Sequence, residues 1–269
     1  MWTDIIDLRD FYASSLGQMT ARLIRRRVRE VWPNLTGEAV LGLGFAPPLL
    51  RAGLDEARHV AAVMPPAMGV LRWPSESPCR SALADELNLP FPDLMFDRVL
   101  IVHALESTHH PHALLREAWR VLKESGRLLV IVPNRLGVWS RLERSPFAVG
   151  RPYSPLQLQA LLRDSLFTPT QSTGALYLPP FQSRMMLASA SAVEEVGRRW
   201  FAGFSGVLLA EAAKQVYAAG LTREAAVKKR SVIALPQGMG RVSHPPLGRK
   251  ATHTKGSVSS LGPPIKSTQ

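Results

Sequence analysis

The feature of this sequence that most constrains its fold is an alternation of short apolar runs with amphipathic segments. Four runs carry apolar side chains almost without interruption: residues 38–44, 59–64, 96–105 and 126–134. Strands buried on both faces of a sheet have this composition. Residues 112–125 and 154–167 instead space apolar side chains three and four positions apart, as amphipathic helices do. The alternation predicts an open α/β sheet covered on both faces, with a ligand at the carboxyl ends of its strands.

Local signals mark the ends of these two helices. Ser154 and Pro155 suit the N-cap and the first turn of the later helix, and Gly126 suits the C-cap of the earlier one. Beyond residue 167 the pattern weakens. There we expect a strand at 174–180, a helix at 191–204, and either a strand or a helix at 205–218.

The N-terminal segment is predicted to be helical over residues 7–32, where apolar side chains recur at helical spacing up to Pro33. Gly17 is a candidate break in this helix. Five arginines crowd its second half: Arg22, Arg25, Arg26, Arg27 and Arg29. They could form a phosphate-binding face, but we favour a solvated face whose cations lie near the C-terminus of the helix.

Composition excludes several classes of protein. The chain has 269 residues, of which 46% are apolar, so a disordered protein is excluded. The single cysteine, Cys79, can form neither an internal disulfide nor a multi-cysteine zinc site, and it favours a reduced compartment. No apolar run approaches the roughly 18 residues of a membrane span. The first ten residues carry acids where a secretory signal carries basic residues, so we expect a cytoplasmic protein.

The charge is concentrated at the C-terminal end. From Lys228 onward there are eight basic residues and no acid, which account for eight of the net twelve positive charges. We therefore divide the chain into an N-terminal helical segment at 1–37, an α/β domain at 38–222 and a basic tail at 223–269 that we expect to be disordered. The tail could contact nucleic acid or anionic lipid, but a solubilising extension is favoured because no aromatic residues interleave for base stacking.

Other candidate chemistry is weak. His109, His110 and His112 surround Pro111, but adjacent histidines before a proline do not converge easily on one ion, and no cysteine or carboxylate nearby completes a set. We therefore expect no metal site. The sequence has no G-x-S-x-G and no Walker loop.

Ordered motifs at and after the first strand carry a family resemblance. The strand ends in Gly42-Leu43-Gly44-Phe45-Ala46, where glycines let the backbone turn closely beside a ligand. The stretch 85–93 (DELNLPFPD), then Phe96-Asp97, the helix end 119–123 (WRVLK) and Gly126-Arg127-Leu128 follow in order. This series resembles the class I S-adenosylmethionine-dependent methyltransferases of the small-molecule, type 11-like kind, over about residues 38–135. The resemblance implies a Rossmann-like, doubly wound, seven-stranded sheet with an N-terminal helix.

The resemblance also implies roles for individual residues. The cofactor would be bound by Gly42, Leu43, Gly44, Ala46, Asp85, Glu86, Leu87 and His103. Asp85 would accept from the adenine amino group, Leu87 would flank the ring, and His103 would face the methyl group as an optional base. The substrate pocket would include Asn134, Arg135 and Trp139, although these could equally be a surface connection with arginine stems on apolar neighbours. From the first helix, Tyr12 and Gln18 could cover the cofactor.

Two positions depart from the family pattern. Ala46 stands where a third glycine is usual. Met64 ends the second strand, where the family has an acid that holds the ribose hydroxyls; Glu76 follows later and could reach back. An unreplaced ribose contact should cost around 1–3 kcal/mol of cofactor binding.

We therefore predict transfer of a methyl group from S-adenosylmethionine to an O, N or C acceptor. The alternative is a catalytically inactive relative that binds a partner. An enzyme directed at nucleic acid is not favoured, because Val132-Pro133-Asn134-Arg135 is not an Asn-Pro-Pro-Tyr motif.

Overall fold

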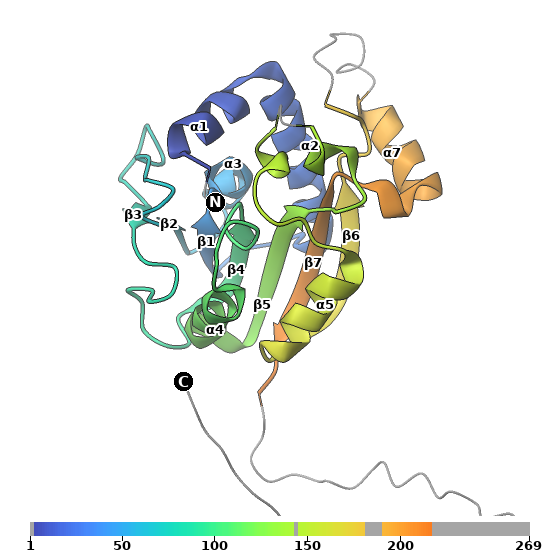
Figure 1. The fold of residues 1–269 in the computed structure, drawn as a ribbon. Helices are drawn as coiled ribbons and strands as arrows, with labels where there is room; N and C mark the ends of the chain where they lie inside the picture. The colour runs from blue at the N-terminus through green and yellow to red at the C-terminus, as the bar shows by residue number, and fades with distance from the viewer. Residues whose placement is uncertain (1–2, 143–144, 181–189, 217–269) are drawn as a thin grey trace, which may run out of the picture. The chain divides into compact units, whose positions relative to one another are not determined.

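The computed structural model describes residues 3–142, 145–180 and 190–216 (Figure 1). Within them one seven-stranded sheet has the order β3-β2-β1-β4-β5-β7-β6. Its strands are β1 Ala39–Gly44, β2 His59–Met64, β3 Ser81–Leu83, β4 Phe96–Val102, β5 Leu122–Pro133, β6 Phe167–Ala175 and β7 Val207–Lys214. β7 is antiparallel to both of its neighbours, and the other pairs are parallel. The predicted seven-stranded α/β sheet is confirmed, whereas the predicted tail at 223–269 lies outside the described residues.

Six α-helices accompany the sheet in the described residues: α1 Ile5–Ala13, α2 Ser15–Val31, α3 Pro47–Leu50, α4 Pro111–Val121, α5 Pro155–Asp164 and α7 Ala190–Trp200. Short 3-10 turns follow at Arg51–Gly53, Val138–Ser140, Pro146–Ala148 and Ala202–Phe204. Across the described ranges, no helix combines the length and apolar composition needed to cross a bilayer.

The sheet separates two apolar layers, because successive side chains of a strand point to opposite faces. In β1, Val40 joins the layer beneath α1, α2 and α3, and Leu41 joins the layer beneath α4 and α5. In β4, Leu100 and Ile101 divide in the same way. All four side chains are at most 1% exposed. The uninterrupted apolar runs of these strands therefore reflect burial on both faces, as predicted.

The N-terminal helix breaks at Ser14, not at Gly17. Ser14 ends α1, and its hydroxyl caps α2 by accepting from the N–H of Gly17 at 3.1 Å. Gly17 lies inside α2, where a Cβ would meet the carbonyl oxygen of Phe11 at 1.9 Å. The glycine is thus needed for close packing rather than for a turn. The confirmed cap at Ser154, which forms a capping box with Gln157, starts α5 as predicted.

The predicted C-cap at Gly126 is wrong. Helix α4 ends at Val121, and Leu122 is already extended, with φ −80° and ψ 136°. Leu122 pairs with Phe96 of β4, and Lys123 binds the carboxylate of Asp97 at 2.8 Å. These pairings across the sheet end the helix early and make β5 four residues longer at its start than the sequence pattern indicated.

Three further boundaries differ from expectation or resolve an open one. β6 covers Phe167–Ala175, so the predicted strand at 174–180 overlaps only its end. Its middle is polar and exposed because it is an edge strand. The open segment 205–218 contains β7, a strand. β3, with three residues at the other edge, has no apolar run and was not predicted.

Candidate functional site

The turn after β1 is closed by the chain's own atoms. Gly44 has a left-handed φ of 79°, and a Cβ there would lie 2.1 Å from the carbonyl oxygen of Val102. A Cβ on Gly42 would lie 2.5 Å from the Cβ of Ala46 and 2.6 Å from Cδ1 of Leu50. Both positions therefore require glycine. Ala46, at the position of the usual third glycine, is fully buried.

The loop after β3 carries the predicted adenine-binding residues. The side chain of Asp85 is exposed, and its Oδ1 accepts from the N–H of Leu87 at 2.9 Å. Glu86 accepts from the hydroxyl of Thr108 at 3.4 Å, and Leu87 is half-buried. Among the described residues no donor contacts Oδ2 of Asp85, so that oxygen can accept from a ligand.

This loop is held by a polar cluster on α4. Arg120 donates to the carbonyl oxygens of Leu89 at 2.9 Å and Phe91 at 2.8 Å, and it binds Glu117 at 2.8 Å. Glu117 in turn accepts from the N–H of Leu89 at 2.9 Å. The hydrogen bond with Arg120 lowers the pKa of Glu117, against the opposing effect of burial. The helix motif thus fixes the position of the acidic loop.

His103 is enclosed directly after β4. It has a left-handed φ of 56° and is 2% exposed. Its Nε2 lies 2.9 Å from the hydroxyl of Tyr12 on α1, and its ring lies 4.8 Å from that of Phe147. The N–H of Ile5 donates to the carbonyl of Met68 at 2.9 Å and holds α1 against the loop after β2. The N-terminal helix therefore covers His103.

Glu106, to which the sequence motifs assign no role, completes this cluster. It is 3% exposed, its Oε1 lies 3.4 Å from Nδ1 of His103, and neither carboxylate oxygen receives a hydrogen bond in the described structure. Burial, followed by the charge of Glu106, raises the pKa of Tyr12, and the same causes raise that of Tyr153 to about 12. Tyr12 is therefore a neutral phenol beside His103. The position of Glu106 three residues after the histidine that follows the strand was the one sequence feature that could have pointed to this carboxylate.

The three predicted substrate-pocket residues lie in different surroundings. Asn134 is fully buried, and its Nδ2 donates to the carbonyl of Ser205 at 2.8 Å. Trp139 is 1% exposed, and its Nε1 donates to the carbonyl of Leu178 at 2.7 Å. These contacts account for both residues as structural. Arg135 is exposed and lines a cavity of about 290 Å³.

The end of β2 offers no acid. Met64 is fully buried in the layer beneath α1 and α2, while Leu43 of β1 lies in the opposite layer. Glu76 is exposed on the loop that follows. A cavity of about 280 Å³ lies between α1, the turn after β1 and this loop, and Arg51 and Arg72 are among its lining residues. A bound ligand at this edge would meet cations rather than a strand-end carboxylate.

No group of three or more candidate ligands that could hold a metal occurs in the described ranges. His109 and His110 are exposed, and Nδ1 of His112 lies 3.3 Å from the hydroxyl of Ser165. Cys79 is exposed, and a hydrogen bond with a neighbouring serine lowers the pKa of its thiol.

Comparison with known proteins finds a family that matches part of this chain. Residues 40–130 match the family described as a methyltransferase domain. A demethylmenaquinone methyltransferase of Corynebacterium efficiens is 32% identical over 130 residues, which cover 48% of this chain and 56% of that protein. A ubiquinone/menaquinone biosynthesis C-methyltransferase of Chromobacterium violaceum is 44% identical over 66 residues, 24% of this chain and 25% of that protein. The chain thus spans about half the length of these curated relatives or less.

Solved structures agree on the fold. A methyltransferase bound to the Trm112 methyltransferase activator of Haloferax volcanii superposes with a TM-score of 0.56 at 18% identity, over 80% of this chain and 99% of the other. Residues 40–130 of this chain therefore match a methyltransferase domain, within a seven-stranded α/β sheet whose fold this solved structure shares.

Proposed function

We propose that this protein transfers a methyl group from S-adenosylmethionine to a ring carbon of a quinone precursor. The observation that carries the proposal is the buried Tyr12, His103 and Glu106 cluster at the carboxyl end of β4. It places a base at the edge of the sheet where ligands of such folds bind. The quinone precursor is supported by the names of the relatives, one of which acts on demethylmenaquinone.

The residues present fit the adenine and the positively charged methionine part of the cofactor, but not its ribose. Asp85 offers a free carboxylate oxygen for an adenine amino group, beside the apolar Leu87. Glu106 is a buried carboxylate without a donor, and a positive sulfonium or ammonium group would neutralise it. The ribose end lacks its usual acid, because Met64 is in the core. Gly42 and Gly44 keep the turn after β1 compact.

When bound, S-adenosylmethionine supplies an activated methyl group; the chain's residues handle the proton. Loss of a phenolic proton raises electron density on the ring carbons of the acceptor. The acceptor's phenolic proton would pass to the oxygen of Tyr12 as the proton of Tyr12 passes to Nε2 of His103. After the methyl group has bonded to the ring carbon, the hydrogen on that carbon would leave as a proton and return to the acceptor's oxygen, which restores the aromatic ring. Glu106, 3.4 Å from Nδ1, would stabilise the resulting imidazolium. Tyr12 also lines the cavity of about 280 Å³ beside α1, from which an acceptor would approach it.

Calorimetric titration with S-adenosylmethionine and S-adenosylhomocysteine tests the cofactor site. We expect micromolar binding that Asp85→Ala weakens at least tenfold. The matched control is Asp55→Ala, an exposed acid on the loop before β2, which should bind as the parent does. Absence of binding up to millimolar ligand by the folded chain would refute the proposal.

Mass spectrometry of a demethylated naphthoquinol incubated with the protein and cofactor tests the acceptor. We expect a gain of one methyl group on carbon. His103→Gln and Glu106→Gln should abolish the gain, and His103→Gln should still bind S-adenosylhomocysteine. Cofactor binding without any methylation of quinols would retain the methyltransferase and reject the quinone acceptor.

A further inference from the structure

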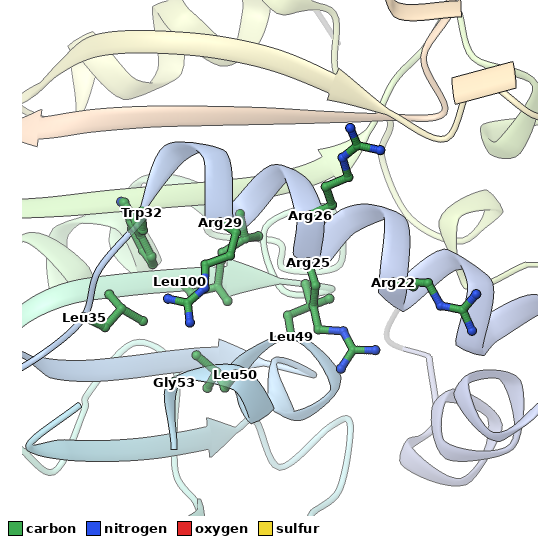
Figure 2. A pocket seen from close by; sticks show the side chains of 11 residues that line it. Arg22, Arg25, Arg26, Arg29, Trp32, Leu35, Leu49, Leu50, Gly53 and Leu100 are labelled. Carbon is green, nitrogen blue, oxygen red and sulfur yellow. The ribbon is translucent and has the colours of Figure 1, made fainter. Parts of the chain in front are cut away.

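A third cavity lies away from the carboxyl edge of the sheet, beneath helix α2 (Figure 2). Its volume is about 300 Å³, at the lower end of the roughly 300–1,000 Å³ of small-molecule pockets. Figure 2 shows its apolar floor, which includes Leu35, Leu49, Leu50 and Leu100. Trp32 closes one end, where its Nε1 donates to Glu211 at 3.0 Å. The floor of the cavity is thus apolar.

The cavity exists because the helix after β1 is short. The glycine turn predicts a following helix, but α3 has only four residues and passes into a 3-10 turn at Arg51–Gly53. Leu100, in the middle of β4, therefore lines a cavity instead of packing entirely against a long helix. Helix α2 lies over this opening (Figure 2).

Arginines of α2 form the rim. All four arginines line the cavity. In Figure 2, Arg25 and Arg29 project toward the leucine side chains, Arg22 extends outward farther along the helix, and Arg26 points to the opposite side. Arg29 forms a two-pronged ion pair with Glu56. The sequence predicted a solvated arginine face on this helix. In the structure, the same helix also places arginines beside an apolar pocket.

Two of the rim cations have no acidic partner among the described residues. Arg25 donates from Nε to the carbonyl of Ala21 at 3.2 Å, and neither Arg22 nor Arg25 takes part in a described ion pair. Burial lowers the pKa of Arg25, and so do the positive charges of Arg51 and Arg22. The rim therefore concentrates positive charge that an anion would relieve.

We infer that this pocket binds a small anionic amphiphile, with its hydrocarbon part on the leucine floor and its carboxylate or phosphate against Arg22 and Arg25. Nucleic acid fits less well, because the floor is aliphatic and offers no row of aromatic faces for bases. The inference is independent of the methyl-transfer proposal, because none of the lining residues belongs to the Tyr12, His103 and Glu106 cluster or to the Asp85 loop.

Titration of the full chain with dodecyl phosphate below its micelle concentration tests this inference. We expect micromolar binding, at least tenfold weaker in the double variant Arg22→Gln/Arg25→Gln. The matched control, Arg163→Gln/Arg199→Gln, removes two exposed arginines from α5 and α7 and should bind as the parent does. Equal weakening in both double variants would refute the pocket and indicate general charge attraction.

Further titrations measure the contributions of the anionic group and of the hydrocarbon chain separately. Inorganic phosphate and decyl maltoside, which supply only an anion or only a chain, should each bind at least tenfold more weakly than dodecyl phosphate. Gly53→Leu, which would fill the pocket while leaving its arginines in place, should abolish binding of dodecyl phosphate with the thermal midpoint largely retained. Phosphate binding as tightly as the amphiphile, or binding only to phosphatidylglycerol vesicles, would overturn the proposal in favour of a surface anion or membrane contact. Asp85→Ala should leave this binding unchanged.

Discussion

Substitution of Arg120 by methionine should lower the free energy of unfolding by about 3 kcal/mol. The side chain is 29% exposed and binds Glu117, which is 15% exposed, together with the carbonyl oxygens of Leu89 and Phe91. A hydrogen bond to a charged group contributes roughly 1.5–3 kcal/mol when it is sheltered from water. The fourth contact, with Asp93, adds less than about 1 kcal/mol because Asp93 is 70% exposed. Water replaces some of the lost bonds, which brings the sum to about 3 kcal/mol.

Urea denaturation at neutral pH measures this loss. With a slope of about 2 kcal/mol per molar urea, the midpoint should fall by roughly 1.5 M. The matched control is Arg116→Met, an exposed arginine on the same helix with no ion pair among the described residues. It should shift the midpoint by less than about 0.25 M, which corresponds to about 0.5 kcal/mol. Equal shifts in both variants would refute the reasoning.

The same variant has a defined pH dependence. Arg120 holds the pKa of Glu117 below its ordinary range in the folded protein. The stabilisation is therefore complete above the ordinary glutamate pKa, about 4.3, and is lost as pH falls through the lowered value. The difference between parent and Arg120→Met should narrow below pH 4. A gap that stays constant to pH 3 would show that Glu117 is not the partner that matters.

Three further predictions concern the turn, the core and the buried phenols. Gly44→Ala should destabilise by about 4 kcal/mol and Gly37→Ala by only about 1 kcal/mol, because both have a left-handed φ but only the first would meet backbone; equal urea midpoints would contradict this. Met64→Asp, which restores the family's acid, should cost about 3–5 kcal/mol because the side chain is fully buried, and a cofactor-binding variant of parental stability would show that the position can open. Burial raises the pKa of Tyr12 and Tyr153 in the folded protein. Their contribution to the free energy of unfolding is therefore complete below the ordinary tyrosine pKa of about 10 and is lost as pH rises above it. The variant with both tyrosines replaced by phenylalanine should lose less stability between pH 9 and 11 than the parent.

The sheet could be predicted because burial on both faces leaves a direct record in sequence. β1, β2 and β4 have apolar residues at nearly every position, and their boundaries matched to within three residues. The edge strands could not be found in this way, since β3 has three residues and the middle of β6 is exposed. The predicted end of α4 was wrong for a different reason. Leu122 and Lys123 contact β4, which is distant in sequence, and these contacts outweighed the local signal of Gly126.

The site could be predicted only in part. The sequence placed His103 directly after β4 and the glycine turn at the end of β1, and the structure has them there because these positions follow from the topology. Sequence order alone did not show that Tyr12, 91 residues away, contacts His103, or that Glu106 is buried beside it. Asn134 and Trp139 follow β5, as expected of residues at the substrate pocket. However, their side-chain N–H groups donate to the backbone of distant segments. Which polar groups remain free for a ligand is decided by packing.

The position of β7 between β5 and β6 has a consequence for synthesis of the chain on the ribosome. Strands β1 to β5 can pair once residue 133 has emerged, yet β6 gains a partner only after residues 207–214 have followed. Until then the free edge of β5, which includes Leu129 and Ile131, stands open to other chains. A nascent chain stalled near residue 200 should therefore depend on chaperones, and release from that dependence should occur within the few residues that complete β7.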